Sequence, residues 1–87
     1  MLTFKDCLDF SELTEEEILA IAEHENLPEL AALELGNALV QTPTGERRIE
    51  EMIVDDIRAA QRVGNVRHAA ALKLVLQHYI ALHPKAG

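Results

Sequence analysis

The chain has 87 residues, a formal charge of −7 and 48% hydrophobic residues. A chain of this length forms one domain and has no room for a second core. No uncharged run reaches the about 18 residues that a membrane span needs, and the acidic balance argues against nucleic acid, since phosphate neutralisation supplies most of that affinity. We therefore expect a single domain over residues 1–87, with no membrane and no nucleic acid as partner.

The N-terminal residues predict at most a short helix over residues 4–10, docked on the rest of the chain through Phe4 and Phe10. They lack a basic flank followed by an apolar stretch, so we expect no signal peptide. Cys7 is the only cysteine and forms no internal disulfide, which is typical of a reducing compartment. We therefore expect a cytoplasmic protein.

The first strong helix signal lies between Leu13 and Ile18. The side chain of Thr14 is able to cap the amide of Glu17, and Glu17 is able to reach back to Thr14. Leu13 is able to pack on Ile18 as a hydrophobic staple. The helix is predicted over residues 15–25, because a residue before a proline, here Leu27 before Pro28, is pushed out of the α region.

Three further helices are predicted, over residues 28–41, 46–63 and 66–82. The first begins at Pro28, which suits the first turn of a helix, and the segment Thr42-Pro43-Thr44-Gly45 is predicted as a turn before the second. Gly64-Asn65 separates the last two, since glycine suits the left-handed position after a helix and asparagine suits an N-cap. Strand-like alternation is absent. The pattern predicts an all-α fold, a compact four-helix bundle with a short N-terminal helical segment.

The apolar positions indicate more apolar surface than one bundle buries. Residues 46–63 have a single apolar arc, and residues 66–82 have a main apolar face with a second strip behind it that includes Leu74. We expect Leu74 on an interaction surface, and a homodimer fits this pattern as well as a monomer does. The arc comprises Ile49, Met52, Ile53, Ile57, Ala60 and Val63, the main face Leu72, Val75, Leu76, Tyr79 and Ile80, and the strip Ala70, Leu74 and Ala81.

The charge is divided unevenly along the chain. Residues 1–43 contain ten Asp/Glu and one lysine, a formal −9, whereas residues 44–87 contain seven Lys/Arg and five Asp/Glu, a formal +2. Such asymmetry is typical of an electrostatic surface that faces a partner or the protein's own other half. We expect the acidic half to lie partly against the arginines of the last two helices. The acidic surface that remains is expected at Glu12, Glu15, Glu16 and Glu23.

Asp56 has the most unusual position, because it lies in the apolar arc of residues 46–63. A buried carboxylate needs a partner, or its pKa rises. Antiparallel packing of the last two helices places Asp56 level with Lys73, and His68 lies on the same apolar face. We expect Lys73, an arginine or a free helix amide to satisfy Asp56. The alternative is a ligand-binding or proton-transfer carboxylate in a pocket.

The four histidines, at positions 24, 68, 78 and 83, do not have the spacing of a helical metal site. Such a site uses two ligands at i,i+4 or Glu-x-x-His pairs, and neither occurs. We expect histidines with hydrogen-bonded rings at the boundaries of the apolar faces, and neither a metal nor a cofactor. The sequence also lacks a glycine-rich phosphate loop, a calcium loop and a nucleophile elbow. An enzyme is therefore the less favoured class.

Four segments, LTEEEI at 13–18, AIAEHE at 20–25, ALELG at 32–36 and MIVDDI at 52–57, resemble small uncharacterised helical proteins of proteobacteria. The resemblance covers most of the chain and implies a bacterial cytosolic setting. It implies no activity, cofactor or catalytic residue.

These observations favour a small non-catalytic interaction or regulatory module that acts on a protein partner or on a second copy of itself. The alternative is a small-molecule or metal-binding helical protein, or a minor enzyme, centred on Asp56 and a histidine. A cavity beside Asp56 or His68 distinguishes the two hypotheses.

Overall fold

Helices form most of the computed structural model, which describes residues 4–9 and 11–83. The described part of the chain contains no strand. The predicted all-α fold, a four-helix bundle, is therefore confirmed, and a short helix precedes the four long ones. The helices are α1 (Phe4–Asp9), α2 (Glu15–Glu25), α3 (Glu29–Leu39), α4 (Pro43–Arg62) and α5 (Val66–Leu82).

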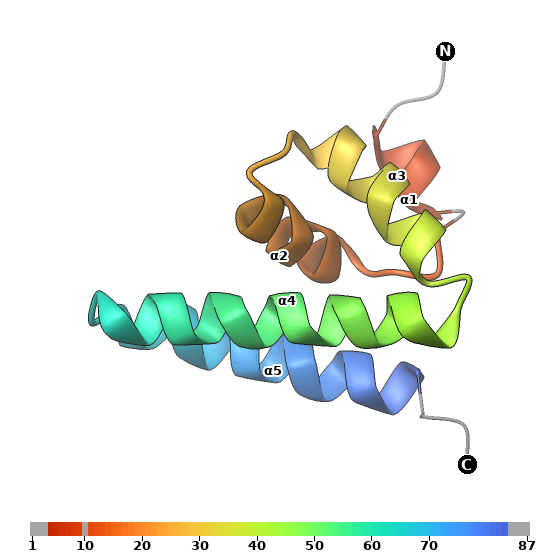
Figure 1. Cartoon of the computed structure of the whole chain (residues 1–87). Coiled ribbons are helices and arrows are strands. Elements are labelled where there is room, and N and C mark those ends of the chain that lie inside the picture. The colour runs from red at the N-terminus through yellow and green to blue at the C-terminus, as the bar shows by residue number, and fades with distance from the viewer. Residues whose placement is uncertain (1–3, 10, 84–87) are drawn as a thin grey trace.

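Helix α4 is the central element of the bundle. It pairs with α5 in a long helical hairpin, and α2 and α3 lie together across its other side (Figure 1). Helix α5 meets α4 along its length and contacts α2 much less, while α1 packs on α3. As a result, α4 is covered from two sides, whereas α5 is covered mainly from one.

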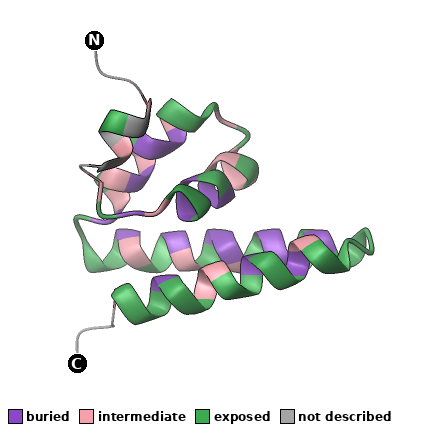
Figure 2. Ribbon diagram, turned by 180° about the vertical axis from the view of Figure 1, so that it is seen from behind, coloured by how far each residue is buried: buried purple, intermediate pink, exposed green. Residues whose placement is uncertain are grey.

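The core lies between α4 and the helices around it. Ile18 and Ile21 of α2 and Ile49 and Ile53 of α4 have no exposed surface. Figure 2 shows buried residues along α4 where it faces the other helices and exposed residues over most of α5. Phe4 packs against this core as predicted, whereas Phe10 and the side chain of Cys7 lie outside the described residues. No helix among the described residues is long and apolar enough to cross a membrane.

The local signals at the start of α2 form the predicted capping box. Thr14 Oγ1 accepts a hydrogen bond from the Glu17 amide at 3.3 Å, and Glu17 Oε1 accepts one from the Thr14 amide at 2.8 Å. The helix ends at Asn26, which adopts the left-handed conformation with φ 55°. Because each end is closed by a local interaction, α2 has the bounds that the sequence predicted, residues 15–25.

The junction between α3 and α4 differs from the prediction. Helix α3 ends at Leu39 instead of residue 41, and α4 begins at Pro43 instead of residue 46. Thr42 is the N-cap, since its Oγ1 accepts a hydrogen bond from the Gly45 amide at 3.0 Å, and Pro43 occupies the first helical position. Proline suits that position because its missing N–H would be unpaired there anyway. The predicted turn is thus the first turn of α4.

One predicted core residue, at the turn between α4 and α5, is exposed in the structure. Val63, assigned to the apolar arc, is 80% exposed. It follows the last residue of α4, where the chain turns through Gly64 (φ 76°) into the N-cap Asn65. The arc therefore ends at Ala60, which is buried.

Candidate functional site

Asp56 is buried as predicted, with 4% of its surface exposed, but it does not pair with Lys73. Lys73 is exposed and has no ion pair with Asp56 within 4.0 Å. Lys73 follows the buried Leu72 by one position, so it points about 100° away from the face that packs on α4. Among the described residues, no arginine has an ion pair with Asp56 within 4.0 Å, and the buried Oδ2 of Asp56 has no hydrogen-bond partner. The expectation that Lys73, an arginine or a helix amide pairs with Asp56 is therefore wrong.

Two histidines connect α2 to the α4–α5 hairpin, and both act electrostatically on Asp56. His24 of α2 has Nε2 at 2.9 Å from Asp55 Oδ2 of α4, and Nδ1 at 2.6 Å from Glu25 Oε2. Both ring nitrogens face carboxylate oxygens, which accept hydrogen bonds when ionised, so this environment favours the protonated ring, in which both nitrogens donate. Burial lowers the pKa of His24, but the hydrogen bonds to Asp55 and Glu25 outweigh it and raise the pKa above 6.5.

The second bridge joins α5 to α2. His68 Nε2 lies 2.7 Å from Glu23 Oε1. Both side chains keep substantial exposure, 41% for His68 and 46% for Glu23, so the bridge is at the surface and not in the core. His68 thus contacts a carboxylate on α2 that the sequence did not connect with it, and the predicted polar site of Asp56 with His68 stays a prediction.

The environment of Asp56 explains its protonation. Burial raises the pKa of Asp56 to about 7, and the negative charges of Glu23 and Asp55 add to this effect, while His24 and His68 oppose it. At neutral pH the carboxyl group is therefore divided between its neutral and charged forms. This is the behaviour of a carboxyl group that has lost water without gaining a cationic partner.

The arginines do not receive the acidic half of the chain. In the part of the chain that the structure describes, the only arginine in an ion pair is Arg48, which lies 3.8 Å from Glu51 of its own helix. Glu23 and Glu25 contact histidines instead. The expected docking of the acidic half on arginines is therefore wrong. The physical reason is that the arginines of α4 lie on its exposed outer side, whereas α2 covers its inner side.

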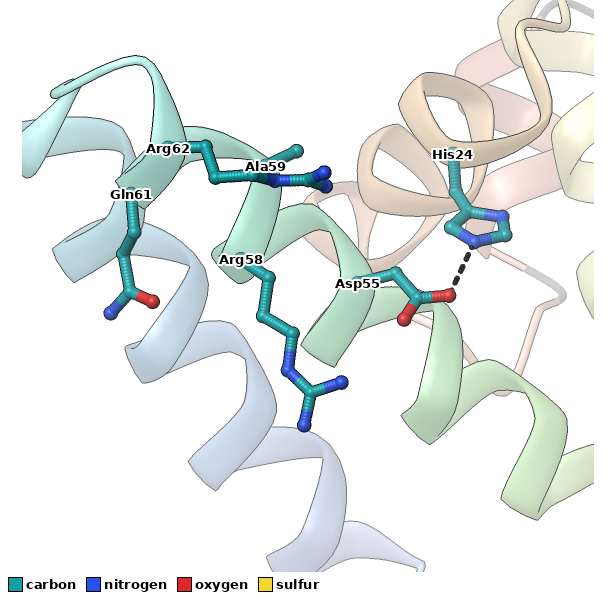
Figure 3. A pocket seen from close by; sticks show the side chains of 6 residues that line it. All are labelled: His24, Asp55, Arg58, Ala59, Gln61 and Arg62. Atoms are coloured by element: carbon teal, nitrogen blue, oxygen red, sulfur yellow. Dashed lines mark hydrogen bonds and ion pairs between the residues drawn. The ribbon is translucent and has the colours of Figure 1, made fainter.

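Arg58 and Arg62 flank an open recess beside the His24–Asp55 hydrogen bond. Figure 3 shows both side chains extending from successive turns of α4, with Gln61 between them in the sequence. Within the described residues, neither guanidinium has a carboxylate within 4.0 Å. Two cationic groups thus remain available at the end of α4 that leads into the turn.

A groove of about 310 Å³ lies between α2 and α5. We call it the α2–α5 groove. It exists because both helices pack on α4 but contact each other only slightly. Leu19, 40% exposed, lies on its α2 side, and Ala71 and Val75 lie on its α5 side. Its full lining comprises Glu16, Leu19, Ala20, Glu23, His68, Ala71, Leu72 and Val75.

Acidic side chains border the groove. Glu16 and Glu23 flank Leu19 on α2, and the Glu23–His68 bridge closes one end. Asp56 does not line the groove. The residues predicted as an acidic interaction surface, Glu12, Glu15, Glu16 and Glu23, are all exposed, and two of them belong to this border.

Leu74 extends the apolar surface beyond the groove. It is 67% exposed and follows Ala71 by three residues, so the two side chains are neighbours on α5. The sequence identified Leu74 and the acidic residues but missed the groove. Leu19 was the available signal, because it is a large apolar residue between two glutamates on the polar side of α2.

Among the described residues, no group of three or more His, Cys, Asp or Glu side chains is arranged to hold a metal ion. No protein-family model, curated protein or solved structure matches this chain. The resemblance to proteobacterial proteins stays a prediction.

Proposed function

We propose that this protein is a small non-catalytic interaction module whose α2–α5 groove receives an apolar segment of a protein partner with basic residues on both sides. The observation that carries the proposal is the combination of an apolar groove with an acidic border. An apolar groove between two helices is a common docking site for an amphipathic helix. The border selects among such helices by charge.

The spacing of the border defines the partner further. Glu16 and Glu23 are one heptad apart on α2, which corresponds to about 10 Å along the helix. Leu19 lies between them on the same face. A matching partner therefore carries an apolar anchor with Lys or Arg on either side at a similar separation. The negative border speeds the encounter with such a partner more than it tightens the complex.

The alternative function, a ligand site or minor enzyme centred on Asp56 and a histidine, has less support, although the groove does lie beside His68. Asp56 itself does not line this groove. A catalytic carboxyl group must be within hydrogen-bond reach of its substrate. The raised pKa of Asp56 is explained by burial and by the negative charges of Glu23 and Asp55, so it does not require a catalytic role. The bacterial and cytoplasmic setting stays a prediction.

The experiment compares two synthetic helical peptides with the same alanine-rich sequence and the same central leucines. One peptide has lysines one heptad apart around the leucines, and the other has glutamates at those positions. We expect the lysine peptide to bind at least about tenfold more tightly. In NMR titrations, we expect its largest shifts at the amides of Leu19, Ala71 and Val75. Added salt should weaken the binding, since the border is exposed.

A pair of matched variants locates the binding. Leu19→Lys places a positive charge in the groove and should abolish binding of the lysine peptide. Leu30→Lys makes the same change on α3, where Leu30 is 50% exposed, and should leave the affinity unchanged. Equal affinities for both peptides, or equal effects of both variants, would contradict the proposal.

A further inference from the structure

We propose that the partner of the α2–α5 groove is a second copy of this chain, which inserts the turn between its α4 and α5. The inference rests on the proposed function of the groove and names its occupant. We call residues 58–67 the hairpin tip. Each copy supplies one tip and one groove, so the two insertions are reciprocal.

The hairpin tip has the chemistry that the groove requires. Val63 and Val66 are 80% and 77% exposed, the most exposed large apolar residues of the described chain. Arg62 and Arg67 flank them directly. Residues 57–87 contain five Lys/Arg and no Asp or Glu, so the tip is basic although the chain as a whole is acidic. Two apolar anchors between two arginines complement an apolar groove between two glutamates.

The position of the tip leaves it free to be inserted. In Figure 1 the α4–α5 turn reaches beyond the end of α2, and Figure 2 shows from the opposite side that this turn stands apart from α2 and α3. The residues of the tip are exposed except for Ala60, which is buried. An exposed pair of valines at the end of a protruding hairpin is an apolar surface without a partner among the described residues of its own chain.

The order of tip and groove along α5 permits a closed dimer. The groove begins at His68, only two residues after Val66. A two-fold axis near His68 therefore sets the α5 helices of the two copies antiparallel, and each tip then enters the groove of the other copy. Such an interface uses the same surface on both copies and ends at a dimer.

This arrangement predicts specific charge pairs. Glu23 lies beside His68, and α2 continues away from it toward Glu16 at the level of Val75. With antiparallel α5 helices, Arg67 of the second copy lies near Glu23, and Arg62 of the second copy lies near Glu16. Both glutamates thus gain a guanidinium, the cation best suited to a carboxylate.

The first test is the mass of the full chain in solution. Sedimentation equilibrium at low salt should give a dimer, twice the 9.7 kDa of one chain, and high salt should dissociate it. The double variant Val63→Glu with Val66→Glu should be monomeric and keep the helical signal of the wild type, because both residues are exposed. Leu30→Glu, a matched change on α3, should leave the dimer intact. A wild-type monomer at all concentrations overturns the inference.

Charge exchange tests the orientation. Glu16→Arg should weaken the dimer by at least about tenfold, and Arg62→Glu in the same chain should restore it. Failure of the second change to restore the dimer overturns the proposed pairing of tip and groove.

Peptide binding separates failure of this inference from failure of the proposed function. The monomeric Val63→Glu, Val66→Glu variant should bind the lysine peptide more tightly than the wild type does, because no tip occupies its groove. A wild-type monomer that binds the lysine peptide at Leu19 would overturn the inference and leave the proposed function standing. If the wild type is a dimer but the tip variant binds neither peptide, the proposal that the α2–α5 groove is a docking site is wrong.

Discussion

Asp56 combines deep burial with a missing partner. Within the described part of the chain, its buried Oδ2 atom has no hydrogen-bond partner, and the charged groups that act on its pKa are two carboxylates and two histidines. A neutral carboxyl group costs much less to bury than a carboxylate. The folded protein therefore binds a proton at Asp56 more tightly than the unfolded chain does, and its stability depends on pH.

Asp56→Asn should stabilise the protein at high pH. The folded-state pKa of about 7 lies above the ordinary value of 3.8, so the wild type is most stable below about pH 4 with respect to this group. That contribution is lost as the pH rises toward 7. At pH 8, the asparagine variant should exceed the wild type in free energy of unfolding by about 2 to 4 kcal/mol, and at pH 4 the two should agree. Urea denaturation at both pH values measures the difference.

Asp55→Asn is the matched control on the neighbouring residue. Asp55 is half exposed and accepts a hydrogen bond from His24, so its loss should lower stability by less than about 1 kcal/mol. His24 also loses its contribution above pH 6.5, because its folded-state pKa is raised. A destabilised Asp56→Asn variant at pH 8 would contradict this account of the buried carboxyl group.

Two glycines provide a second prediction at the residue scale. A Cβ atom on Gly45 would lie 1.8 Å from the carbonyl oxygen of Leu39, which is backbone and cannot move aside. A Cβ atom on Gly36 would meet only the ends of the Leu13 and Ile21 side chains, at 2.5 and 3.1 Å. Gly45→Ala should therefore lower the free energy of unfolding by about 3 kcal/mol or more, and the melting temperature should fall with it. Gly36→Ala should cost much less, because alanine favours a helix interior by about 1 kcal/mol. Equal effects in thermal denaturation would contradict this ranking.

At the scale of the element, the helices with complete local signals are the ones whose bounds follow from sequence. The capping box and Asn26 delimit α2, and Gly64 with Asn65 delimits the start of α5. The start of α4 was misplaced because Thr42-Pro43 satisfies the rules of a turn and of a helix start equally. Which of them forms depends on the contact of Gly45 with Leu39 of α3, and this tertiary contact is not visible in the sequence.

Thr14→Ala should remove half of the capping box of α2 and destabilise the protein by about 1 kcal/mol. The amide of Glu17 loses its acceptor, which lies 3.3 Å away. Thr44→Ala is the control, since Thr44 is exposed in the first turn of α4 and is not its N-cap. Chemical denaturation should show a loss for Thr14→Ala and a change of less than about 0.5 kcal/mol for Thr44→Ala. Similar losses in both variants would contradict the role of the cap.

At the scale of the whole molecule, the α2–α5 groove forms because the molecule is only about two helices thick. The extents are 40 × 36 × 18 Å, and the shortest is close to two helix diameters of about 10 Å. Two layers of helices cannot cover α5 from both sides, so the α2–α5 groove and Leu74 remain uncovered. The sequence predicted this excess of apolar surface and placed Leu74 in it, but it missed the groove, because the groove depends on how α2 and α5 diverge over α4.

The charge asymmetry is also visible in the sequence, but the contacts that it makes are not. The sequence shows an acidic first half and a basic second half, but the expected pairing of the acidic half with arginines does not form within the described residues. Histidines take the place of the arginines toward α2, and Arg58 and Arg62 stay at the hairpin tip. The pattern therefore indicates complementary surfaces between molecules, which a single chain does not bring together.

Photochemical cross-linking from the groove tests this account most directly. Leu19 is replaced by a benzoylphenylalanine in the full chain, and an equal mixture of light and ¹⁵N-labelled protein is irradiated, so that mass spectrometry identifies links between copies. The account predicts links from position 19 to residues 62–67 of another copy, and none from the same replacement at Leu30. Links that are equally frequent from both positions, or that never reach the α4–α5 turn, would contradict it.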